Sequence, residues 1–146
     1  MSDYFENFKD ALPDIKKVKQ LKKQLEKKGV KYIYSNWIDF LGSPKTKPMP
    51  LSDFEDLCMG KGPQFAVHSV SFVPELTPAD NDQIPLPDLD SLLICPWDKT
   101  CAWVFADLYW NDKPYDVCPR MTLKKQIKQS AKSDLKFFVG IEPEFF

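Results

Sequence analysis

The C-terminal run of residues 136–146 constrains the fold of this chain more than any other stretch, because it is very apolar and yet contains two carboxylates. The residues are Lys-Phe-Phe-Val-Gly-Ile-Glu-Pro-Glu-Phe-Phe, a pattern that predicts a half-buried β-strand. Side chains alternate between the two faces of a strand, so Glu142 and Glu144 would project to one side with Cα atoms roughly 6.5 Å apart. Ile141 and Phe145 would face the other side. The sequence therefore predicts two anions held side by side.

Two interpretations of this carboxylate pair are open from the residues alone. Burying an unpaired charge costs several kcal/mol, so a half-buried pair needs cations, and hard oxygen ligands suit Mg²⁺ or Mn²⁺. The alternative is a solvated strand face on which Glu142 and Glu144 bind nothing.

The N-terminal third has the pattern of a helix followed by a hairpin. Apolar residues recur at helical spacing over 14–28, lysines occupy the other faces, and Gly29 stands where a helix commonly ends. Residues 30–41 are rich in aromatic and β-branched side chains, 42–44 have turn chemistry, and 45–49 form a second short run. We predict a helix that covers a sheet, followed by two antiparallel strands.

The rest of the chain alternates strand-like runs with a long proline-rich connection. Strand-like segments occupy 63–72, 91–97 and 101–109, and a helical pattern covers 123–131. Between the first two, residues 74–87 contain prolines at four positions among acidic and amide residues. We predict a loop over that stretch, of the kind that is usually functional or mobile.

Composition excludes several classes of protein. A net charge of -1, from 20 basic and 21 acidic residues, leaves no electrostatic footprint for nucleic acid. No run of about 18 apolar residues predicts a membrane span. The four cysteines form no Cys-x-x-Cys pair and lie far in sequence from the single histidine, His68, which argues against a zinc site. We predict a reduced, cytoplasmic setting with buried, inert thiols.

Several motifs resemble, in one order, those of the glutamine synthetase family. The C-terminal Gly-Ile-Glu-Pro-Glu-Phe-Phe resembles the family's glycine-x-Glu-x-Glu-Phe strand. Asn81-Asp82-Gln83 with Pro87-Asp88 resembles its Ser-Asp-Met-x-x-x-Pro-Asp segment with two substitutions. Further positions from about Val30 onward are in register with the family: Asp39, Gly42, Met49, Pro50, Gly62, Phe65, Ser69, Trp97, Asp107, Pro114, Pro119, Arg120, Leu123 and Lys124.

The resemblance implies a fold and a division into domains. The fold class is α+β: a β-grasp-like mixed sheet with covering helices, followed by the first helix and strand of a glutamine-synthetase-type catalytic domain. Residues 1–29 would form an amino-terminal helical segment and 30–115 the β-grasp domain. Residues 116–146 would be the truncated start of the catalytic domain.

The resemblance also implies roles for particular residues. Glu142 and Glu144 would be metal ligands, one for each of the two principal ions of the site. In ammonia-using members an aspartate attracts ammonium and accepts its proton, and Ala66 stands at that position here. A different amine, a different base or a relaxed nitrogen site is therefore implied. His68 is the nearest titratable side chain, although a lone histidine on a strand is commonly just packed or hydrogen-bonded.

The implied function is that of an ATP-dependent ligase joining glutamate to ammonia or an amine through γ-glutamyl phosphate, with Mg²⁺ or Mn²⁺. Family members form homo-oligomeric rings whose active sites lie between neighbouring subunits. Most catalytic residues would lie beyond position 146, so we expect the chain to be inactive alone. The alternative is a non-catalytic binding or regulatory module that pairs with a full-length relative. Neither nucleic acid nor a membrane is an expected partner.

Overall fold

The computed structural model describes residues 3–68 and 75–146. Helices and short strands alternate along the chain, which confirms the predicted α+β class. In order, the elements are α1 (Phe8–Ala11), α2 (Ile15–Lys27), β1 (Tyr32–Ile38), β2 (Pro44–Pro50), the 3₁₀ turn η1 (Leu51–Asp53), α3 (Phe54–Cys58), β3 (Phe65–Ala66), β4 (Asp82–Pro87), the 3₁₀ turn η2 (Leu89–Ser91), β5 (Leu93–Ile94), β6 (Cys101–Trp110), β7 (Lys113–Pro114) and α5 (Pro119–Ala131).

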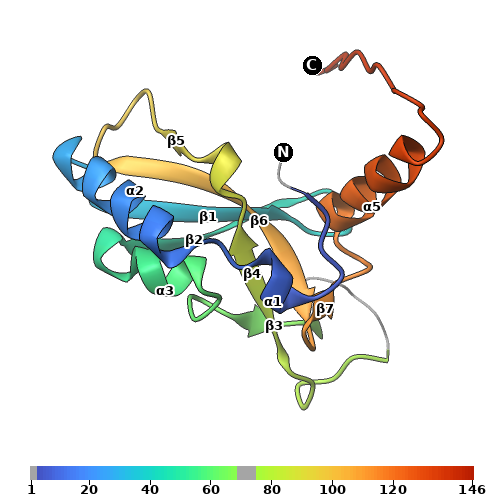
Figure 1. Cartoon of the computed structure of the whole chain (residues 1–146), viewed down its shortest axis with the longest axis horizontal. Helices are drawn as coiled ribbons and strands as arrows, with labels where there is room; N and C mark the ends of the chain where they lie inside the picture. Colours follow the sequence, from blue (N-terminus) through green and yellow to red (C-terminus); the bar gives the residue numbers. More distant parts are fainter. Residues whose placement is uncertain (1–2, 69–74) are drawn as a thin grey trace.

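The long strand β6 organises the sheet (Figure 1). The strand order is β2-β1-β6-β4-β3, and β5 and β7 also pair with β6. The first half of β6 runs parallel to β1 and antiparallel to β5, whereas its second half pairs antiparallel with β4 and β7. This mixed pairing about a central strand confirms the predicted β-grasp-like sheet.

Helix α2 forms where the sequence predicts it, and its two ends show why. The Asp14 side chain accepts a hydrogen bond from the backbone N–H of Lys16 at 2.8 Å, which caps the first turn. Gly29 has φ +82° and the N–H of Val30 donates to the Leu25 carbonyl at 3.1 Å, which closes the last turn with a left-handed glycine. The helix therefore ends at the glycine that the sequence marks.

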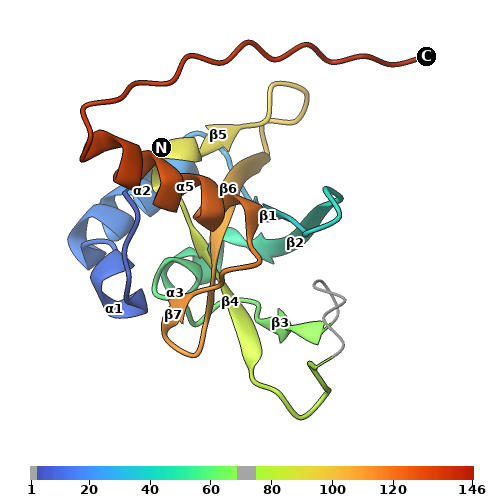
Figure 2. The same cartoon turned by 90° about the vertical axis from the view of Figure 1, so that its right-hand side faces the viewer.

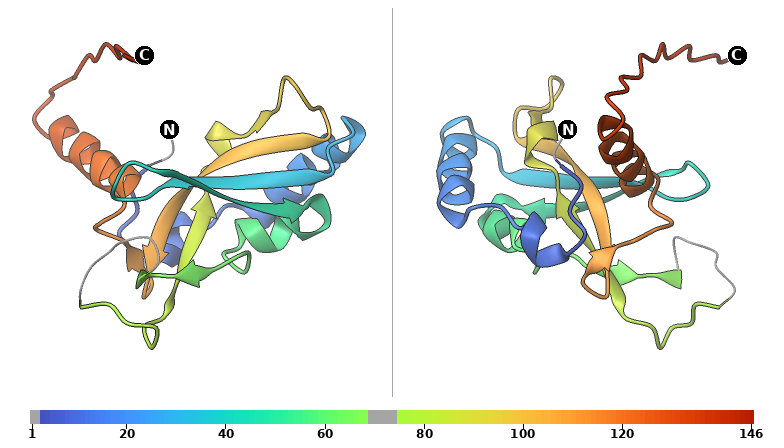
Figure 3. Two further views of the ribbon diagram at one scale, coloured as in Figure 1. Left: turned by 180° about the vertical axis from the view of Figure 1, so that it is seen from behind. Right: turned by 45° about the vertical axis from the view of Figure 1, so that its right-hand side comes forward.

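Two buried clusters form the core. The first lies beneath α2 and α3 and contains Val18, Leu25, Val30, Ile33, Leu51, Phe54, Leu57, Cys58, Ala102 and Val104. The second surrounds the far half of β6 and the start of α5 and contains Trp37, Phe65, Val67, Leu86, Leu108, Tyr109, Tyr115, Cys118 and Met121. Helices α2 and α5 lie toward opposite ends of the molecule in Figure 1, and Figure 3 shows β1 and β6 between them.

Strands β1 and β2 form the predicted hairpin. Their register runs from Tyr32↔Pro50 to Ile38↔Pro44, so β2 is the outer strand of the sheet. Its sequence, Pro-Lys-Thr-Lys-Pro-Met-Pro, places prolines and charges along that edge. Both discourage pairing with a strand of another chain.

The predicted loop over 74–87 is wrong for its second part, because residues 82–87 form β4 between β6 and β3. The N–H of Asp88 donates to the Phe105 carbonyl of β6 at 2.7 Å. Since alternate residues of a strand direct their backbone N to the same side, Pro85 and Pro87 direct theirs away from β6. Strand β3 pairs only with residues 82 and 83, so these prolines give up no ladder hydrogen bond.

The predicted strand over 136–146 is also wrong, since no element of the described structure follows α5. A strand needs a neighbour to pair its backbone N–H and C=O groups, and this segment lies apart from the sheet (Figure 2). Its apolar side chains are uncovered: Phe138 is 95% exposed and Ile141 is 89% exposed. The helix expected at the start of the second domain is present, but the strand expected after it is not.

Two predictions from composition can be compared with the structure. All four cysteines are buried free thiols, as expected. Among the described residues, no helix combines the length and the apolar character needed to cross a bilayer.

Candidate functional site

Glu142 and Glu144 lie in the extended segment after α5, and both are exposed. Their carboxylates have the donor chemistry that Mg²⁺ and Mn²⁺ prefer, but such ions take about six oxygen ligands. Across residues 3–68 and 75–146, no group of three or more His, Cys, Asp or Glu side chains is placed to hold a metal ion. The two glutamates therefore fit the role of partial ligands, and the described residues do not complete a coordination shell around them.

Ala66 is held at the end of the sheet by its neighbour in β3. The Phe65 ring stacks on Trp37 of β1 at 4.3 Å between ring centroids, with the planes 5° apart. The Lys47 ammonium also donates to the carbonyl of Gln64 at 2.7 Å. These contacts fix the short strand that contains Ala66, although a two-residue strand has few backbone bonds of its own.

Directly across from Ala66 in the β3–β4 register lies Asp82. Side chains of opposed residues in an antiparallel pair lie on the same face, with Cβ atoms about 4.5–5.5 Å apart. A carboxylate therefore adjoins the position where the sequence lacks one. Sequence reasoning matched Asp82 to a family motif but did not connect it with Ala66, because β4 was expected to be a loop.

His68, the other candidate near Ala66, is half-buried. It is the last described residue before the segment 69–74, so the motif position Ser69 lies outside the described residues. The segment after α5, which contains Glu142 and Glu144, lies apart from β3, which contains Ala66 (Figure 1). The sequence-predicted site residues on these two segments are therefore not brought together.

A buried charge network is the most highly organised polar feature of the molecule. The Lys124 ammonium contacts Asp88 at 3.3 Å and also binds Asp107. The Arg120 guanidinium donates from Nε to Asp107 at 3.0 Å and from Nη2 to Asp88. The side chains of Lys124 and Asp88 are each 1% exposed. Two cations thus bridge two carboxylates, and the network is neutral.

The network joins elements that lie far apart in the sequence. Asp88 follows β4, Asp107 comes from the middle of β6, and Arg120 and Lys124 are one turn apart on α5. All four residues belong to motifs that resemble the family, yet only the structure shows that they converge. Because buried ion pairs need well-defined partners, this network fixes α5 against the sheet.

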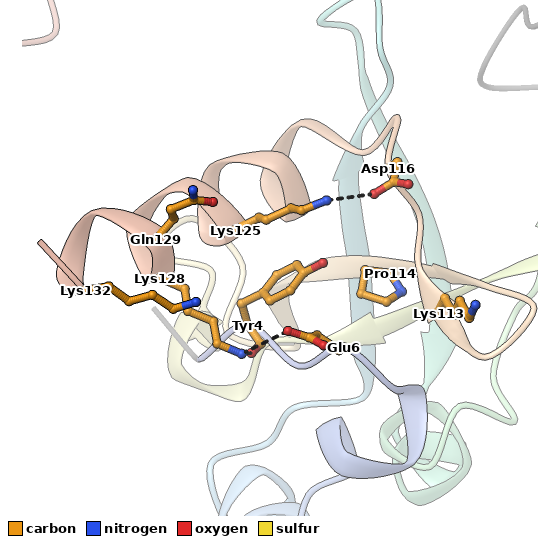
Figure 4. Close-up of a pocket in the computed structure, with 9 residues that line it drawn as sticks. All are labelled: Tyr4, Glu6, Lys113, Pro114, Asp116, Lys125, Lys128, Gln129 and Lys132. Atoms are coloured by element: carbon orange, nitrogen blue, oxygen red, sulfur yellow. Dashed lines mark hydrogen bonds and ion pairs between the residues drawn. The ribbon is translucent and has the colours of Figure 1, made fainter.

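A pocket of about 380 Å³ lies between the N-terminal segment and the outer face of α5 (Figure 4). Lys128 contacts Glu6 at 3.6 Å and Lys125 contacts Asp116 at 3.6 Å. The lining residues are Tyr4, Glu6, Lys113, Pro114, Asp116, Lys125, Lys128, Gln129 and Lys132. Lysines outnumber acids here, but ion pairs between exposed flexible side chains are weak, and the pocket resembles a solvated helix face.

Comparison with known proteins gives consistent results. The chain is 39% identical over 119 residues to a glutamine synthetase of Rhizobium meliloti (strain 1021), over 82% of this chain and 27% of the relative. It is 32% identical over 123 residues to a glutamate–methylamine ligase of Methyloversatilis universalis, over 83% of this chain and 27% of that relative. The chain thus spans about a quarter of the length of these relatives. No protein-family model matches it.

Solved structures of GmaS have the same fold. A GmaS–ADP complex superposes with a TM-score of 0.71 at 28% identity, over 78% of this chain and 26% of the other. GmaS without ligand gives a TM-score of 0.72 with the same identity and coverage.

Proposed function

Because the chain belongs to the glutamine synthetase family, we propose that it is part of an ATP-dependent ligase that joins glutamate to ammonia or an amine. The observation that supports this most strongly is the 39% identity to a glutamine synthetase over 82% of the chain. Similarity to a glutamate–methylamine ligase points to the same reaction type with a different nitrogen donor.

The proposed reaction has two steps. The γ-carboxylate of glutamate takes the terminal phosphoryl group of ATP and ADP is released. The amine nitrogen then attacks the acyl phosphate, loses a proton to a base, forms the amide and displaces phosphate. Divalent ions supply charge neutralisation at the phosphates. Glu142 and Glu144 would each offer a carboxylate to one ion, and the remaining ligands would come from outside the described residues. Residues 30–115 would be the β-grasp domain of this enzyme, after a helical segment at 1–29, and 116–146 would begin its catalytic domain.

The Ala66 region supports an amine rather than ammonia as the nitrogen donor. Ammonium needs a carboxylate that attracts it and accepts its proton, and an alanine methyl group can do neither. A methyl group at this position suits the carbon substituent of an amine instead. Asp82, opposite Ala66 in the β3–β4 register, would then offer a carboxylate for the proton. His68 remains a second candidate base.

Activity of the chain alone is the first test. Purified protein would be incubated with ATP, glutamate, Mg²⁺ and either ammonia or methylamine, and amide formation would be followed by mass spectrometry. We expect no turnover, since two carboxylates cannot complete the coordination of two ions. Turnover by this chain would refute the proposed dependence on further residues.

The proposal that the chain is part of a complete ligase can be tested by reading the coding sequence beyond Phe146. An in-frame continuation containing further glutamates and a histidine is expected, and the complete protein should then form amides from glutamate. In that protein, Ala66→Asp should shift the preference from methylamine toward ammonia. An unchanged ratio of the two kcat/KM values would show that this position does not select the nitrogen donor.

Metal binding by the tail can be measured separately. Calorimetric titration with Mn²⁺ should show a dissociation constant weaker than about 1 mM, because few ligands are present. Glu142→Gln combined with Glu144→Gln should abolish the binding, and Glu26→Gln on the exposed face of α2 serves as the control. Binding that survives the double change, or that the control also removes, would contradict the assignment.

The second candidate function, a non-catalytic module that pairs with a relative, is favoured by one observation. Apolar side chains in the loop between β5 and β6 and on the tail are exposed, including Trp97 at 70% and Phe137 at 75%. Exposed apolar patches of this kind commonly mark interaction sites. Co-purification with a full-length glutamine synthetase, together with a coding sequence that stops at Phe146, would favour the module over the ligase.

A further inference from the structure

The hairpin formed by β5 and β6 places two cysteines opposite each other. The pairs Leu93↔Trp103 and Ile94↔Ala102 define the register, and the next pair in this register is Cys95 and Cys101. The backbone N–H of Cys95 donates to the Cys101 carbonyl at 2.9 Å, whereas the N–H of Cys101 donates to the Asp98 carbonyl at 3.1 Å, so one backbone hydrogen bond joins the pair. Since opposed residues project to one face, the two thiols lie on the same side of the hairpin.

The backbone geometry of this pair suits a disulfide. Residues opposed in an antiparallel pair have Cα atoms about 4.5–5.5 Å apart. Disulfides join residues whose Cα atoms are usually about 4.4–6.8 Å apart, most commonly about 5.5–6 Å. The chain around Cys95 and Cys101 therefore needs no large movement to accept the bond.

The present state of the pair is a dithiol held by local contacts. The Cys101 thiol donates to the Asp98 carboxylate at 3.3 Å, and both thiols are buried. Burial, and then the neighbouring Cys101 and Asp98, raise the pKa of the Cys95 thiol. On β1, the pKa of the Tyr34 hydroxyl is raised first by Cys101 and also by Cys95, in keeping with a phenol close to both sulfurs. Bond formation removes the Cys101 S–H and with it the hydrogen bond to Asp98.

The other cysteines have no such arrangement. Cys58 ends α3 and lies in the first core cluster, whereas Cys118 precedes α5 and lies in the second. The two clusters occupy different parts of the sheet, so these thiols are not opposed in any strand pair of the described structure. The geometry is specific to Cys95 and Cys101.

We propose that Cys95 and Cys101 are a modification site, where exchange with a small disulfide such as oxidised glutathione forms an intramolecular disulfide. One thiol loses its proton, and the thiolate attacks the small disulfide, which breaks its S–S bond and releases one glutathione thiol. The second protein thiolate attacks the mixed disulfide and releases the second glutathione. Two protein thiols are oxidised, and one small disulfide is reduced to two thiols.

The experiment equilibrates the purified chain in buffers of increasing oxidised-to-reduced glutathione ratio and traps free thiols with iodoacetamide. Intact mass should show that alkylated thiols fall from four to two at the oxidising end. Trypsin cuts after Lys99, between the two cysteines, so their peptides stay together only through the new bond. The peptide that contains Cys101 also contains Cys118, and fragmentation assigns the linked sulfur.

Variants separate the proposed pair from any other. Cys95→Ser and Cys101→Ser should each retain three free thiols, whereas Cys118→Ala should still form the link and retain Cys58 alone as a free thiol. Four alkylated thiols at every ratio would overturn the proposal. A bond to Cys58 or Cys118, or a bond between two chains, would overturn it equally.

Discussion

Lys124→Met tests whether the buried network fastens α5 to the sheet. Lys124 contacts both carboxylates of the network, and its side chain is 1% exposed. Methionine preserves most of the apolar stem and removes the charge. Arg120 then remains as the cation of the network beside Asp88 and Asp107, and it is itself 20% exposed. Because the carboxylates stay buried, the folded state must bear an unbalanced negative charge.

The expected loss follows from the burial of the remaining charges. Removing one partner of a buried ion pair typically costs 3–5 kcal/mol, and the partial exposure of Arg120 lets some of that charge be resolvated, so we expect about 3 kcal/mol. With a urea m-value of about 2 kcal/mol/M, the unfolding midpoint should fall by about 1.5 M. In calorimetry the same change should lower Tm by roughly 10 °C.

The neighbouring lysine provides the matched control. Lys125 lies on the same helix and contacts Asp116 at 3.6 Å, but the two side chains are 53% and 83% exposed. Lys125→Met should therefore change the free energy of unfolding by less than about 0.5 kcal/mol. Urea unfolding of both variants would be followed by circular dichroism. Equal midpoint shifts in the two variants, or a shift below about 0.5 M for Lys124→Met, would refute the reasoning.

Two further predictions concern the tail and a buried thiol. Deleting residues 135–146 should leave Tm within about 1 °C of the intact chain in calorimetry, because the segment is exposed and outside the sheet; a clear fall would show that it packs. Burial, and then Glu55, raise the pKa of the Cys58 thiol to about 12 from its ordinary value of 9.0. As the pH rises, the thiol ionises in the unfolded state before it does in the folded state. The free energy of unfolding should therefore fall by up to about 1.4 kcal/mol per pH unit from pH 9 toward 12. Cys58→Ala should remove that part of the pH dependence, measured by urea unfolding under reducing conditions.

Elements with a local signal could be predicted from the sequence. Helix α2 has helical periodicity, a capping Asp14 and a terminating Gly29, and all of these act within a few residues of one another. The hairpin of β1 and β2 follows from an aromatic and β-branched run, a short turn and a second short run. The resemblance to one family added the mixed sheet, which local patterns alone do not specify.

What the sequence could not predict depends on long-range pairing. Strand β4 contains Pro85 and Pro87, and prolines in a sequence favour a loop. In the structure both direct their backbone N away from β6, so a strand is possible. The tail shows the converse: residues 136–146 have the composition of a strand but no strand beside them in the described structure. In both cases, whether the segment forms a strand depends on whether another strand lies beside it. The charge network is of the same kind, since its members lie up to 36 positions apart.

The contacts between the start of α5 and the sheet bear on the proposed domain boundary near residue 115. Tyr115, Cys118 and Met121 share one buried cluster with Leu108 and Tyr109 of β6, so the start of α5 packs on the sheet. The charge network adds polar contacts to that apolar packing. If a catalytic domain begins at this helix, its first turns are anchored to the β-grasp sheet, and the two domains would move together at this point.

Gln83→Met tests whether the buried amide of Gln83 lowers the stability of the fold. Gln83 stands where the resembling motif has methionine, it is 0% exposed, and neither amide atom has a hydrogen-bond partner among the described residues. Burying an unsatisfied amide costs about 1–3 kcal/mol, so Gln83→Met should stabilise the fold by about 1 kcal/mol or more in urea unfolding. Gln64→Met at an exposed position should be neutral within about 0.5 kcal/mol. Loss of stability in Gln83→Met would mean that the amide is satisfied and that the glutamine contributes to the packing of β4.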